Sequence, residues 1–429
     1  MEVYRQVSES LARFIEEKKI TLPLNQTTVK ELQEWKPILN LNTEIEEWNS
    51  GCKGLCRLRG MIQDQEEPEL SIGFYTENGR LESCLYGNYM ENAQFVDGIF
   101  VQRYPVVCVP VPGEGLEVEM PRVVFYNEMG EHLVVTSVVD LIGIALNGEF
   151  HVVDIARNRQ FQADCTWRES VLRGLEMCIG DSLAAELLLY NLLSKIQERS
   201  SLIGNLCLNF TNVSSKSETI IKSLKTLTRA VCIQLTLDFL NTQDLTPRKN
   251  LETERLSQSP LQIPNNTLLI LDETKLSQGT LTPKGLENVN VLLQLVQSQS
   301  LSYDFGYSKI NFPTDLKIIV LSQGRSFLKI PTSCSLLSPI NEYIFTDEDR
   351  SYVSFYADFA VSLPDELTKT AQEYFVSKRK DNKITVEDLH QLLLLTRYTA
   401  QSHGILQAQP SHWSHAISLS TQLIERAKV

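Results

Sequence analysis

An acidic pair at the end of an apolar run is the feature of this sequence that most suggests chemistry. The run is NTLLILDE, residues 266–273, and its last two residues are Asp272 and Glu273. In α/β proteins that hydrolyse nucleotides, an Asp at such a strand end lies beside Mg²⁺ and the Glu lies beside the attacking water. That chemistry also requires a loop that holds the phosphates. The pair therefore raises the question of whether the chain is an ATPase.

A phosphate-binding loop follows a strand and has the pattern G-x-x-x-x-G-K-[ST]. Lys216 and Ser217 stand at the last two positions of this pattern, after the strand-like segment 206–210, but Phe210 and Ser215 occupy the glycine positions. The ring of Phe210 would fill the space that a tight turn and the phosphates need. We therefore interpret the Lys-Ser pair and the acidic pair as degenerate positions, and we expect no catalytic residue and no cofactor.

Two groups of residues have the right types for a metal ion. The first consists of four cysteines whose spacing is loose, so that buried free thiols are the favoured interpretation. These are Cys52, Cys56, Cys84 and Cys108. The second is the local pair His412 and His415, to which we give little weight. We expect no metal site, and we interpret the basic run 378–380 as a solvated helix end.

Composition limits the classes of protein to which the chain can belong. It has 429 residues, enough for two or three domains, and is 42% hydrophobic and 22% charged, as is usual for a soluble globular protein. Its net charge of −13 disfavours non-specific binding to DNA or RNA. The first 19 residues are charged throughout, and no apolar run approaches the ~20 residues of a membrane span. We expect reduced cysteines and a location in the cytosol or nucleus.

The apolar patterns predict a multidomain protein of mixed α/β class. Residues 1–50 have helical spacing, and residues 51–150 contain several strand-like runs separated by turn residues, which suggests a small barrel or sandwich. These runs are 55–62, 70–75, 105–111, 121–127 and 132–146.

The second half changes in character at a long helical stretch, residues 167–200. It is interrupted at Gly180, after which Asp181 or Ser182 caps a new helix. Strands then alternate with helices, which predicts a parallel sheet buried on both faces. The expected strands are 206–210, 231–239, 268–273 and 316–322, and the expected helices lie near 217–229 and 285–298. The tail is helical again, with Thr385 as a cap and Asp388 three residues later.

Seven segments in consistent order resemble the family of minichromosome maintenance complex-binding proteins, and together they cover most of the chain. They are RGMIQDQEEPELSIGFY (59–75), VCVPVPGE (107–114), GDSLAAELLL (180–189), LQIPNNTLLILDET (261–274), YDFGYSKINFP (303–313), LSQGRSFL (321–328) and ITVEDLHQLLLLTRY (384–398). Members often carry a long insert after VPVPGE, and this chain is compact there.

The resemblance implies an N-terminal OB-like β domain (51–150), a degenerate AAA+-like α/β domain (160–345) and a C-terminal helical lid (346–429). In this alignment Ser322 stands near the sensor position of an active enzyme, and Pro339 stands where an arginine finger would be. With the glycines missing as well, the resemblance implies a pseudo-enzyme.

The resemblance also implies the partners and the place of action. These are the minichromosome maintenance helicase subunits, with chromatin contacted indirectly, no direct nucleic-acid or membrane binding, and a location in the nucleus, with the cytoplasm as an additional compartment. The family is associated with DNA replication, cell division and sister chromatid cohesion, through assembly, stabilisation or unloading of the helicase.

Two segments, 61–75 and 303–313, are candidate partner-binding regions, with core packing as the alternative interpretation of both. Their candidate residues are Met61, Ile62, Tyr75, Tyr303, Phe305, Tyr307 and Phe312. Two other functions stay open. One is a weak AAA+ ATPase that uses Lys216, Ser217, Asp272 and Glu273, and the other is an OB-type protein that binds single-stranded DNA.

Overall fold

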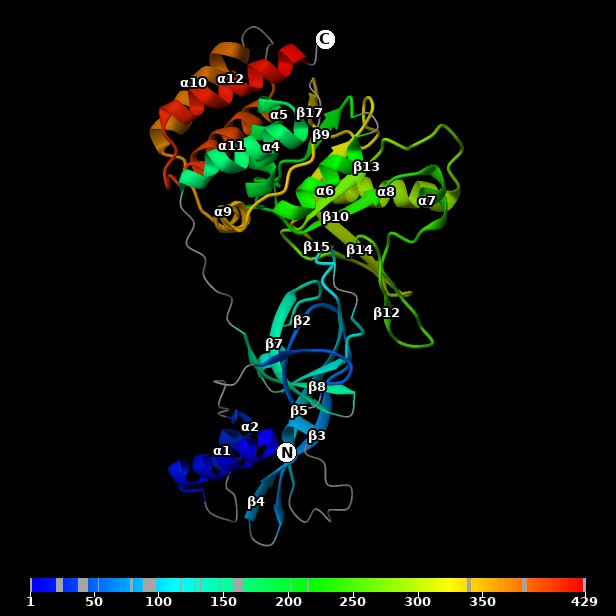
Figure 1. Ribbon diagram of the computed structural model, residues 1–429, viewed down its shortest axis with the longest axis vertical. Helices are drawn as coiled ribbons and strands as arrows, with labels where there is room; N and C mark the ends of the chain where they lie inside the picture. Colours follow the sequence, from blue (N-terminus) through cyan, green and yellow to red (C-terminus); the bar gives the residue numbers. More distant parts are fainter. Residues whose placement is uncertain are drawn as a thin grey trace. The chain divides into compact units, whose positions relative to one another are not determined.

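The protein is a mixed α/β chain that forms two compact units (Figure 1). The computed structural model describes residues 2–20, 26–37, 45–52, 54–77, 80–87, 98–115, 118–126, 128–131, 133–146, 148–156, 165–200, 202–213, 216–337, 341–379 and 384–426. Unit 1 comprises Met1–Arg159, Lys249–Gln258 and Gln262–Pro264, and unit 2 comprises the rest. No helix in these ranges is long and apolar enough to cross a bilayer. The finer division into four domains stays a prediction.

Unit 1 is built around an eight-stranded sheet in the order β1-β2-β7-β8-β6-β5-β3-β4. Its strands are β1 (Glu46–Glu47), β2 (Gly54–Gln65), β3 (Glu69–Glu77), β4 (Arg80–Ser83), β5 (Gly98–Val109), β6 (Arg122–Tyr126), β7 (Val138–Leu146) and β8 (Glu149–Ile155). Because β2 also pairs with β5, five strands close into a ring, β2-β7-β8-β6-β5. Only the β6–β8 pairing within this ring is parallel.

The alternation of side chains along the strands explains why the ring forms. In β2, Cys56 and Leu58 are buried whereas Arg57 between them is exposed, as expected for a strand with one apolar face. A hydrophobic cluster with members from all five ring strands fills the interior. A second cluster joins the outer side of the sheet to helices α1 (Glu2–Lys18) and α2 (Gln26–Gln33). The predicted N-terminal helix and strand-rich region are both confirmed.

A segment far along the chain completes unit 1. The backbone N–H of Leu256 donates a hydrogen bond to Oδ2 of Asp64 (2.8 Å), and its carbonyl accepts one from Nε2 of Gln63 (3.1 Å). The Nε2 atom of Gln262 donates to the carbonyl of Gln63 (3.0 Å). The segment around Leu256 is thus fixed to β2, although about 190 residues separate them in sequence.

Unit 2 contains a five-stranded sheet in the order β10-β13-β16-β9-β17, in which every pairing is parallel. Its strands are β9 (Leu208–Thr211), β10 (Ala230–Gln234), β13 (Leu268–Asp272), β16 (Lys317–Leu321) and β17 (Thr332–Ser335). All five residues of β13 and of β16 are buried, so both faces of the sheet are covered, as predicted. The predicted strand 231–239 is too long, because β10 ends at Gln234 and Thr236 caps a new helix.

The helices of unit 2 mostly lie where the sequence predicts them, but one of them begins at Leu237, inside the predicted strand 231–239. They are α4 (Arg168–Ile179), α5 (Ser182–Leu193), α6 (Ser217–Leu227), α7 (Leu237–Thr242), α8 (Pro283–Ser298), α9 (Asp347–Ala357), α10 (Asp365–Arg379), α11 (Val386–Ser402) and α12 (Pro410–Arg426). Asp181 caps α5 through the N–H of Ala184 (2.9 Å), and Thr385 and Asp388 form a capping box. In Figure 1, α4, α5, α11 and α12 pack together beside the sheet.

An antiparallel hairpin of β14 (Ser300–Asp304) and β15 (Lys309–Pro313) follows α8. The short strand β11 (Arg248–Lys249) pairs with β14 on its other side, through Arg248 and Asp304. The hairpin predicted for 303–313 is therefore confirmed, with its turn at residues 305–308.

Candidate functional site

The acidic pair lies at the carboxyl end of β13, the edge of a parallel sheet where ligands usually bind. The Asp272 side chain is buried, and its Oδ1 atom accepts hydrogen bonds from the N–H of Thr274 (2.9 Å) and from its hydroxyl (2.6 Å). One carboxylate oxygen therefore already has two donors from the turn that follows the strand. This arrangement makes Asp272 a stabiliser of the turn.

Glu273 is held in a similar way by a distant loop. Its Oε1 atom accepts a hydrogen bond from the hydroxyl of Ser326 (2.7 Å). Burial raises the pKa of Glu273, while the hydrogen bonds from Ser326 and from the backbone of Phe327 oppose that rise. A carboxyl group that is enclosed by these partners is poorly placed to polarise a water molecule at the solvent-exposed edge of the sheet.

The Lys-Ser pair reaches the same edge of the sheet. Ser217 begins α6, and its hydroxyl lies 3.4 Å from that of Thr274. Lys275 and Glu218 form an ion pair across this edge (3.4 Å). The structure therefore brings Lys216, Ser217 and the acidic pair together at one end of the sheet. Ser215 lies outside the described residues.

Phe210, on the strand that precedes the Lys-Ser pair, is the residue that bears most directly on whether a phosphate-binding loop exists here. Its side chain is 1% exposed and belongs to the main hydrophobic cluster of unit 2. In register, it lies beside Leu321 on β16 and Cys334 on β17. The ring is therefore part of the core, at the first glycine position of the phosphate-loop pattern.

Sequence reasoning missed three residues that occupy this edge. Thr274, Ser326 and Asn209 supply the hydrogen bonds that satisfy the polar groups there: Asn209 Oδ1 accepts from the hydroxyl of Ser322 (2.9 Å). Only the D-x-T spacing of Asp272 and Thr274 carried a local signal, since an Asp side chain often accepts from the backbone two residues later. The hydroxyl of Ser322, which stands near the proposed sensor position, also lies 2.6 Å from the carbonyl of Gly324, so the two acceptors share its one hydrogen. Pro339 lies outside the described residues.

The candidate partner-binding residues of unit 1 are buried. Met61 and Ile62 on β2, and Tyr75 on β3, all belong to the core of the unit. Their burial favours the core-packing interpretation in this conformation.

The hairpin in unit 2 has buried and exposed aromatic side chains. The ring of Tyr303 is buried and lies 4.5 Å from that of Phe312, and Phe305 lies 6.5 Å from Phe312. Tyr307, at the turn, is 93% exposed. Three rings thus support a turn that presents a fourth aromatic side chain to solvent.

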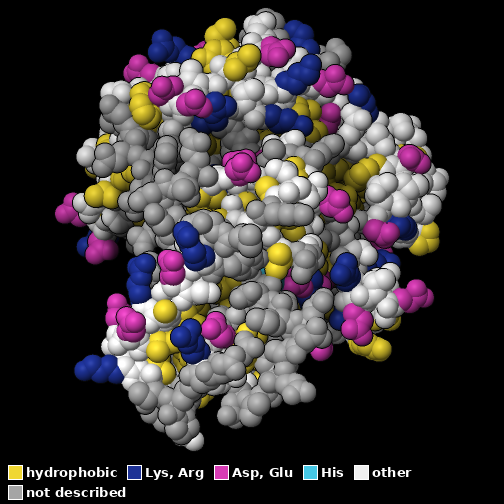
Figure 2. Space-filling view, turned by 60° about the horizontal axis from the view of Figure 1, so that its bottom comes forward, with side chains coloured by type: hydrophobic (Ala, Val, Ile, Leu, Met, Phe, Trp, Pro, Cys, Tyr) yellow, Lys and Arg dark blue, Asp and Glu magenta, His cyan; other side chains and the backbone are white. Residues whose placement is uncertain are grey.

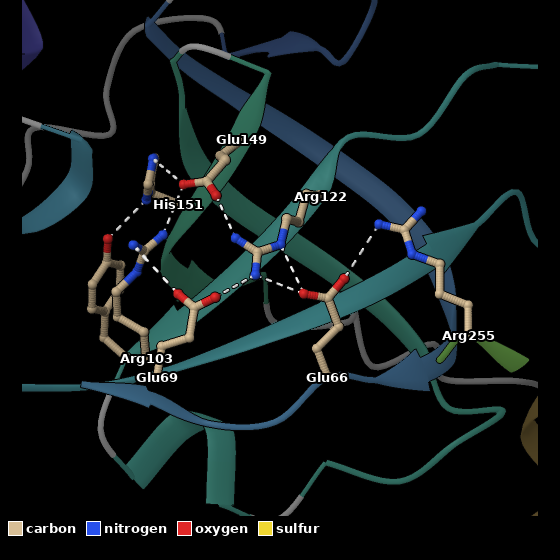
Figure 3. Close-up of polar contacts among 8 residues, drawn as sticks. Glu66, Glu69, Arg103, Arg122, Glu149, His151 and Arg255 are labelled. Atoms are coloured by element: carbon tan, nitrogen blue, oxygen red, sulfur yellow. Dashed lines mark hydrogen bonds and ion pairs between the residues drawn. The ribbon is translucent and has the colours of Figure 1, made fainter. Parts of the chain in front are cut away.

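The outer surface of the ring in unit 1 carries a network of ion pairs (Figure 3). Arg122 on β6 is 2.6 Å from carboxylate oxygens of Glu66, Glu69 and Glu149. Burial lowers the pKa of Arg122, but hydrogen bonds to the three carboxylates outweigh this effect and raise it. Arg103 is also bound to Glu149 (2.7 Å). The charge of these arginines is therefore balanced within the protein.

A histidine lies at one side of this network. His151 is buried and accepts or donates a hydrogen bond with the hydroxyl of Tyr126 (2.8 Å). Burial lowers its pKa to about 4, although the nearby Glu149 raises it. His151 is therefore neutral at physiological pH and acts as a polar core residue.

The metal-binding candidates do not come together in a cluster. Within the ranges that the structure describes, no group of three or more His, Cys, Asp or Glu side chains is placed to hold a metal ion. Cys56 and Cys108 are buried, and burial raises the pKa of each thiol to about 12, so both are protonated at neutral pH. His415 is bound to Glu186 (3.0 Å), and His412 lies nearby on α12. In the basic run, Lys378 lies over the ring of Tyr374, and Lys380 lies outside the described residues.

Comparison with known proteins identifies the relatives of this chain. A protein named Mini-chromosome maintenance complex-binding protein from Danio rerio is 33% identical over 275 residues, which are 58% of this chain and 43% of that protein. Proteins of the same name from Mus musculus and Arabidopsis thaliana are 33% identical over 266 and 282 residues; these cover 56% and 61% of this chain, and 41% and 47% of the relatives. The matched part thus spans less than half the length of these relatives. The family model described as Mini-chromosome maintenance replisome factor matches residues 151–427. Because this match spans well over half of the chain, the chain belongs to that family.

Proposed function

We propose that the chain is a non-enzymatic protein that binds minichromosome maintenance helicase subunits. The partner is inferred from the printed name of the relatives, which describes them as binding proteins of that complex. The observation that favours a non-enzymatic role is the hydrogen bonding of the acidic pair. Thr274 donates to the carboxylate of Asp272, and Ser326 donates to that of Glu273. Such a protein acts by presenting a surface, in assembly, stabilisation or unloading of the helicase in the nucleus.

The folds that the resemblance implies have support in the strand orders of the two units. In unit 1, a closed ring of five strands with a single parallel pairing supports an OB-like domain. In unit 2, the sheet is parallel, and β16 lies between the strand that precedes the Lys-Ser pair and the strand that ends in the acidic pair. This arrangement supports a degenerate AAA+-like domain, with α9 to α12 as its helical lid. A domain of this kind can bind a neighbouring subunit through a large surface without hydrolysing a nucleotide.

The hairpin of unit 2 is the part of the surface that we propose for partner binding. Tyr307 is almost fully exposed at its turn, Ile310 is half exposed, and Tyr303 and Phe312 hold the turn in place from inside. Exposed aromatic residues on a rigid support often carry much of the binding energy of a protein interface. We therefore expect Tyr307 to insert into an apolar pocket of the helicase subunit.

Replacing Tyr307 by alanine should weaken capture of helicase subunits from a cell extract at least tenfold, which corresponds to about 1.4 kcal/mol. The measurement compares the amount of each subunit that the tagged wild-type and variant proteins retain. Leu406→Ala is a matched control, because it also truncates an exposed apolar side chain in unit 2. Failure of the wild type to retain any helicase subunit would contradict the proposed function. Equal retention by wild type and the Tyr307 variant would show that the hairpin is not the binding surface, but it would leave the proposed function standing.

The ATPase alternative makes a different prediction. We expect titration of Mg-ATP into the purified protein to give no saturable signal, because a core residue, Phe210, stands at the first glycine position of the phosphate loop and the carboxylates have internal donors. Lys216→Ala should leave the titration unchanged. Tight binding of ATP that disappears in the Lys216 variant would establish nucleotide binding instead.

The DNA-binding alternative has little support in the charges of unit 1. Arg57 is paired with Asp140 (2.5 Å) and Arg59 with Glu114 (2.8 Å), in addition to the network around Arg122. On the face seen in Figure 2, Lys and Arg side chains are interspersed with Asp and Glu, and the coloured side chains form no large area of one sign. Arginines that are neutralised in this way offer little attraction to a phosphate backbone.

A further inference from the structure

A cavity of about 350 Å³ lies among the helices of unit 2, away from the edge of the sheet described above. Arg168 on α4 and Glu186 on α5 line one part of it, and His403, Ser411, His412 and His415 line the rest. His403 follows α11, and the other three residues belong to α12. Two pairs of helices that are distant in sequence, α4 with α5 and α11 with α12, therefore bring a guanidinium, a carboxylate and three imidazoles to one small space.

Glu186 organises the charged side of this cavity. Its Oε1 atom accepts hydrogen bonds from Arg168 (3.1 Å) and from the hydroxyl of Tyr190 (2.7 Å), and it lies 3.0 Å from Nε2 of His415. Burial raises the pKa of Glu186, but its bonds to His415 and Tyr190 outweigh this and lower it, so the group is a carboxylate at neutral pH. Its hydrogen bond in turn raises the pKa of His415. A guanidinium and an imidazole then share a single carboxylate.

The remaining bonds fix which atoms of the cavity are donors. Nδ1 of His412 accepts a hydrogen bond from the N–H of Gln409 (3.0 Å), so the neutral ring carries its proton on Nε2. Arg168 uses Nε for the hydroxyl of Ser402 (2.9 Å) and Nη2 for Glu186. Among the described residues, neither Nε2 of His412 nor Nη1 of Arg168 has a partner. His412 is only 7% exposed, so most of its ring is enclosed beside the cavity.

The acceptors of the cavity are fewer. Nδ1 of His403 lies 2.8 Å from the carbonyl of Thr399 and must donate to it, so Nε2 of the neutral ring is an acceptor. The ring of His403 is stacked on that of His412, with 6.0 Å between their centroids. The second oxygen of Glu186 is the other acceptor. A ligand that matches this set must offer several acceptor oxygens and at least one proton.

We propose that this cavity binds a phosphate group that retains an ionisable hydroxyl, either as inorganic phosphate or as a small phosphomonoester. The oxygens of the phosphate accept from Arg168, His412 and Ser411, and its hydroxyl donates to Glu186 or His403. A guanidinium and an imidazole that converge on one group are a common way to bind phosphate. Sulfate has the same shape but carries no proton at neutral pH, so the cavity should discriminate against it. This site is independent of the proposed partner binding.

The test is calorimetric titration of the purified full chain with inorganic phosphate, glycerol 3-phosphate and sulfate in separate experiments. We expect saturable binding of at least one of the two phosphates with a Kd at or below about 1 mM, and binding of sulfate at least tenfold weaker. Binding of inorganic phosphate alone would assign the free anion, and tighter binding of glycerol 3-phosphate would assign a phosphomonoester. No saturable binding of either phosphate, or equal affinity for sulfate, would overturn the proposal.

Variants locate the site. Arg168→Lys keeps a positive charge beside Glu186 but removes Nη1, and we expect at least a tenfold loss of phosphate affinity. Arg173→Lys is the matched control on the same helix, since Arg173 is exposed and bonds only to the backbone of Glu169. Ser411→Ala, on an exposed residue, should weaken binding about threefold without affecting folding. Unchanged affinity in both the Arg168 and Ser411 variants would show that phosphate binds elsewhere and overturn the assignment.

Discussion

Replacing Phe210 by alanine should lower the free energy of unfolding of unit 2 by about 3–5 kcal/mol and should not produce nucleotide binding. The ring of Phe210 is 1% exposed and packs in a cluster that contains residues of β9, β13 and β16 and of six helices. Its removal takes apolar surface out of the core and leaves a cavity that the rigid parallel sheet can close only in part. The loss should appear as a lower midpoint of urea denaturation, followed by far-ultraviolet circular dichroism.

The Phe210 variant tests two interpretations of the same residue. If the ring only obstructed a working phosphate loop, the smaller side chain would cost little stability and would allow Mg-ATP to bind. If it is a core residue, as its burial indicates, stability falls and ATP still does not bind. Tyr307→Ala is the control for loss of an aromatic ring, because Tyr307 is exposed and its truncation should change stability by less than about 0.5 kcal/mol. A loss below about 1 kcal/mol in the Phe210 variant would contradict the core assignment.

Local signals in the sequence predicted the secondary structure of unit 2 well. Asp181 and Thr385 are caps because their side chains bond to N–H groups three residues later, and both caps are present. The run that ends at Asp272 forms a strand buried on both faces, as its continuous apolar pattern predicts. The prediction for 231–239 was wrong at its end, since Thr236 caps a helix within an otherwise strand-like run.

Contacts between distant residues could not be predicted from local patterns. Glu273 and Ser326 are 53 positions apart, and only the fold places the hydroxyl beside the carboxylate. The same holds for Arg122, which meets acidic residues of two other segments (Figure 3). The cavity around Glu186 is an extreme case, because His415 lies 229 positions away from Glu186 in the sequence. The two side chains meet only after the helices pack. In the sequence His412 and His415 looked like an isolated pair on a polar tail.

A buried lysine gives the second large effect, and it appears as a dependence of stability on pH. Lys317 begins β16, is 4% exposed, and donates a hydrogen bond to the carbonyl of Leu192. Burial lowers its pKa to about 8, compared with an ordinary value of 10.5, although the charge of Asp315 raises it. Between these two pH values the unfolded chain binds more protons than the folded chain. The stability of the protein relative to a Lys317→Met variant should therefore increase with pH in this window.

The difference in unfolding free energy between wild type and Lys317→Met measures this effect directly. It should shift in favour of the wild type by about 3 kcal/mol between pH 7.5 and pH 10.5, because each unit of pKa shift corresponds to about 1.4 kcal/mol. Above pH 10.5 the contribution is fully present, and it is lost as the pH falls through 8. The cysteines and tyrosines that are buried in the folded protein also titrate in this range in the unfolded chain, but they are common to both proteins and cancel in the difference. Lys222→Met, at an exposed position on α6, should give a difference that does not change with pH. A pH-independent difference for Lys317→Met as well would mean that its ammonium group stays as well solvated in the folded protein as in the unfolded chain.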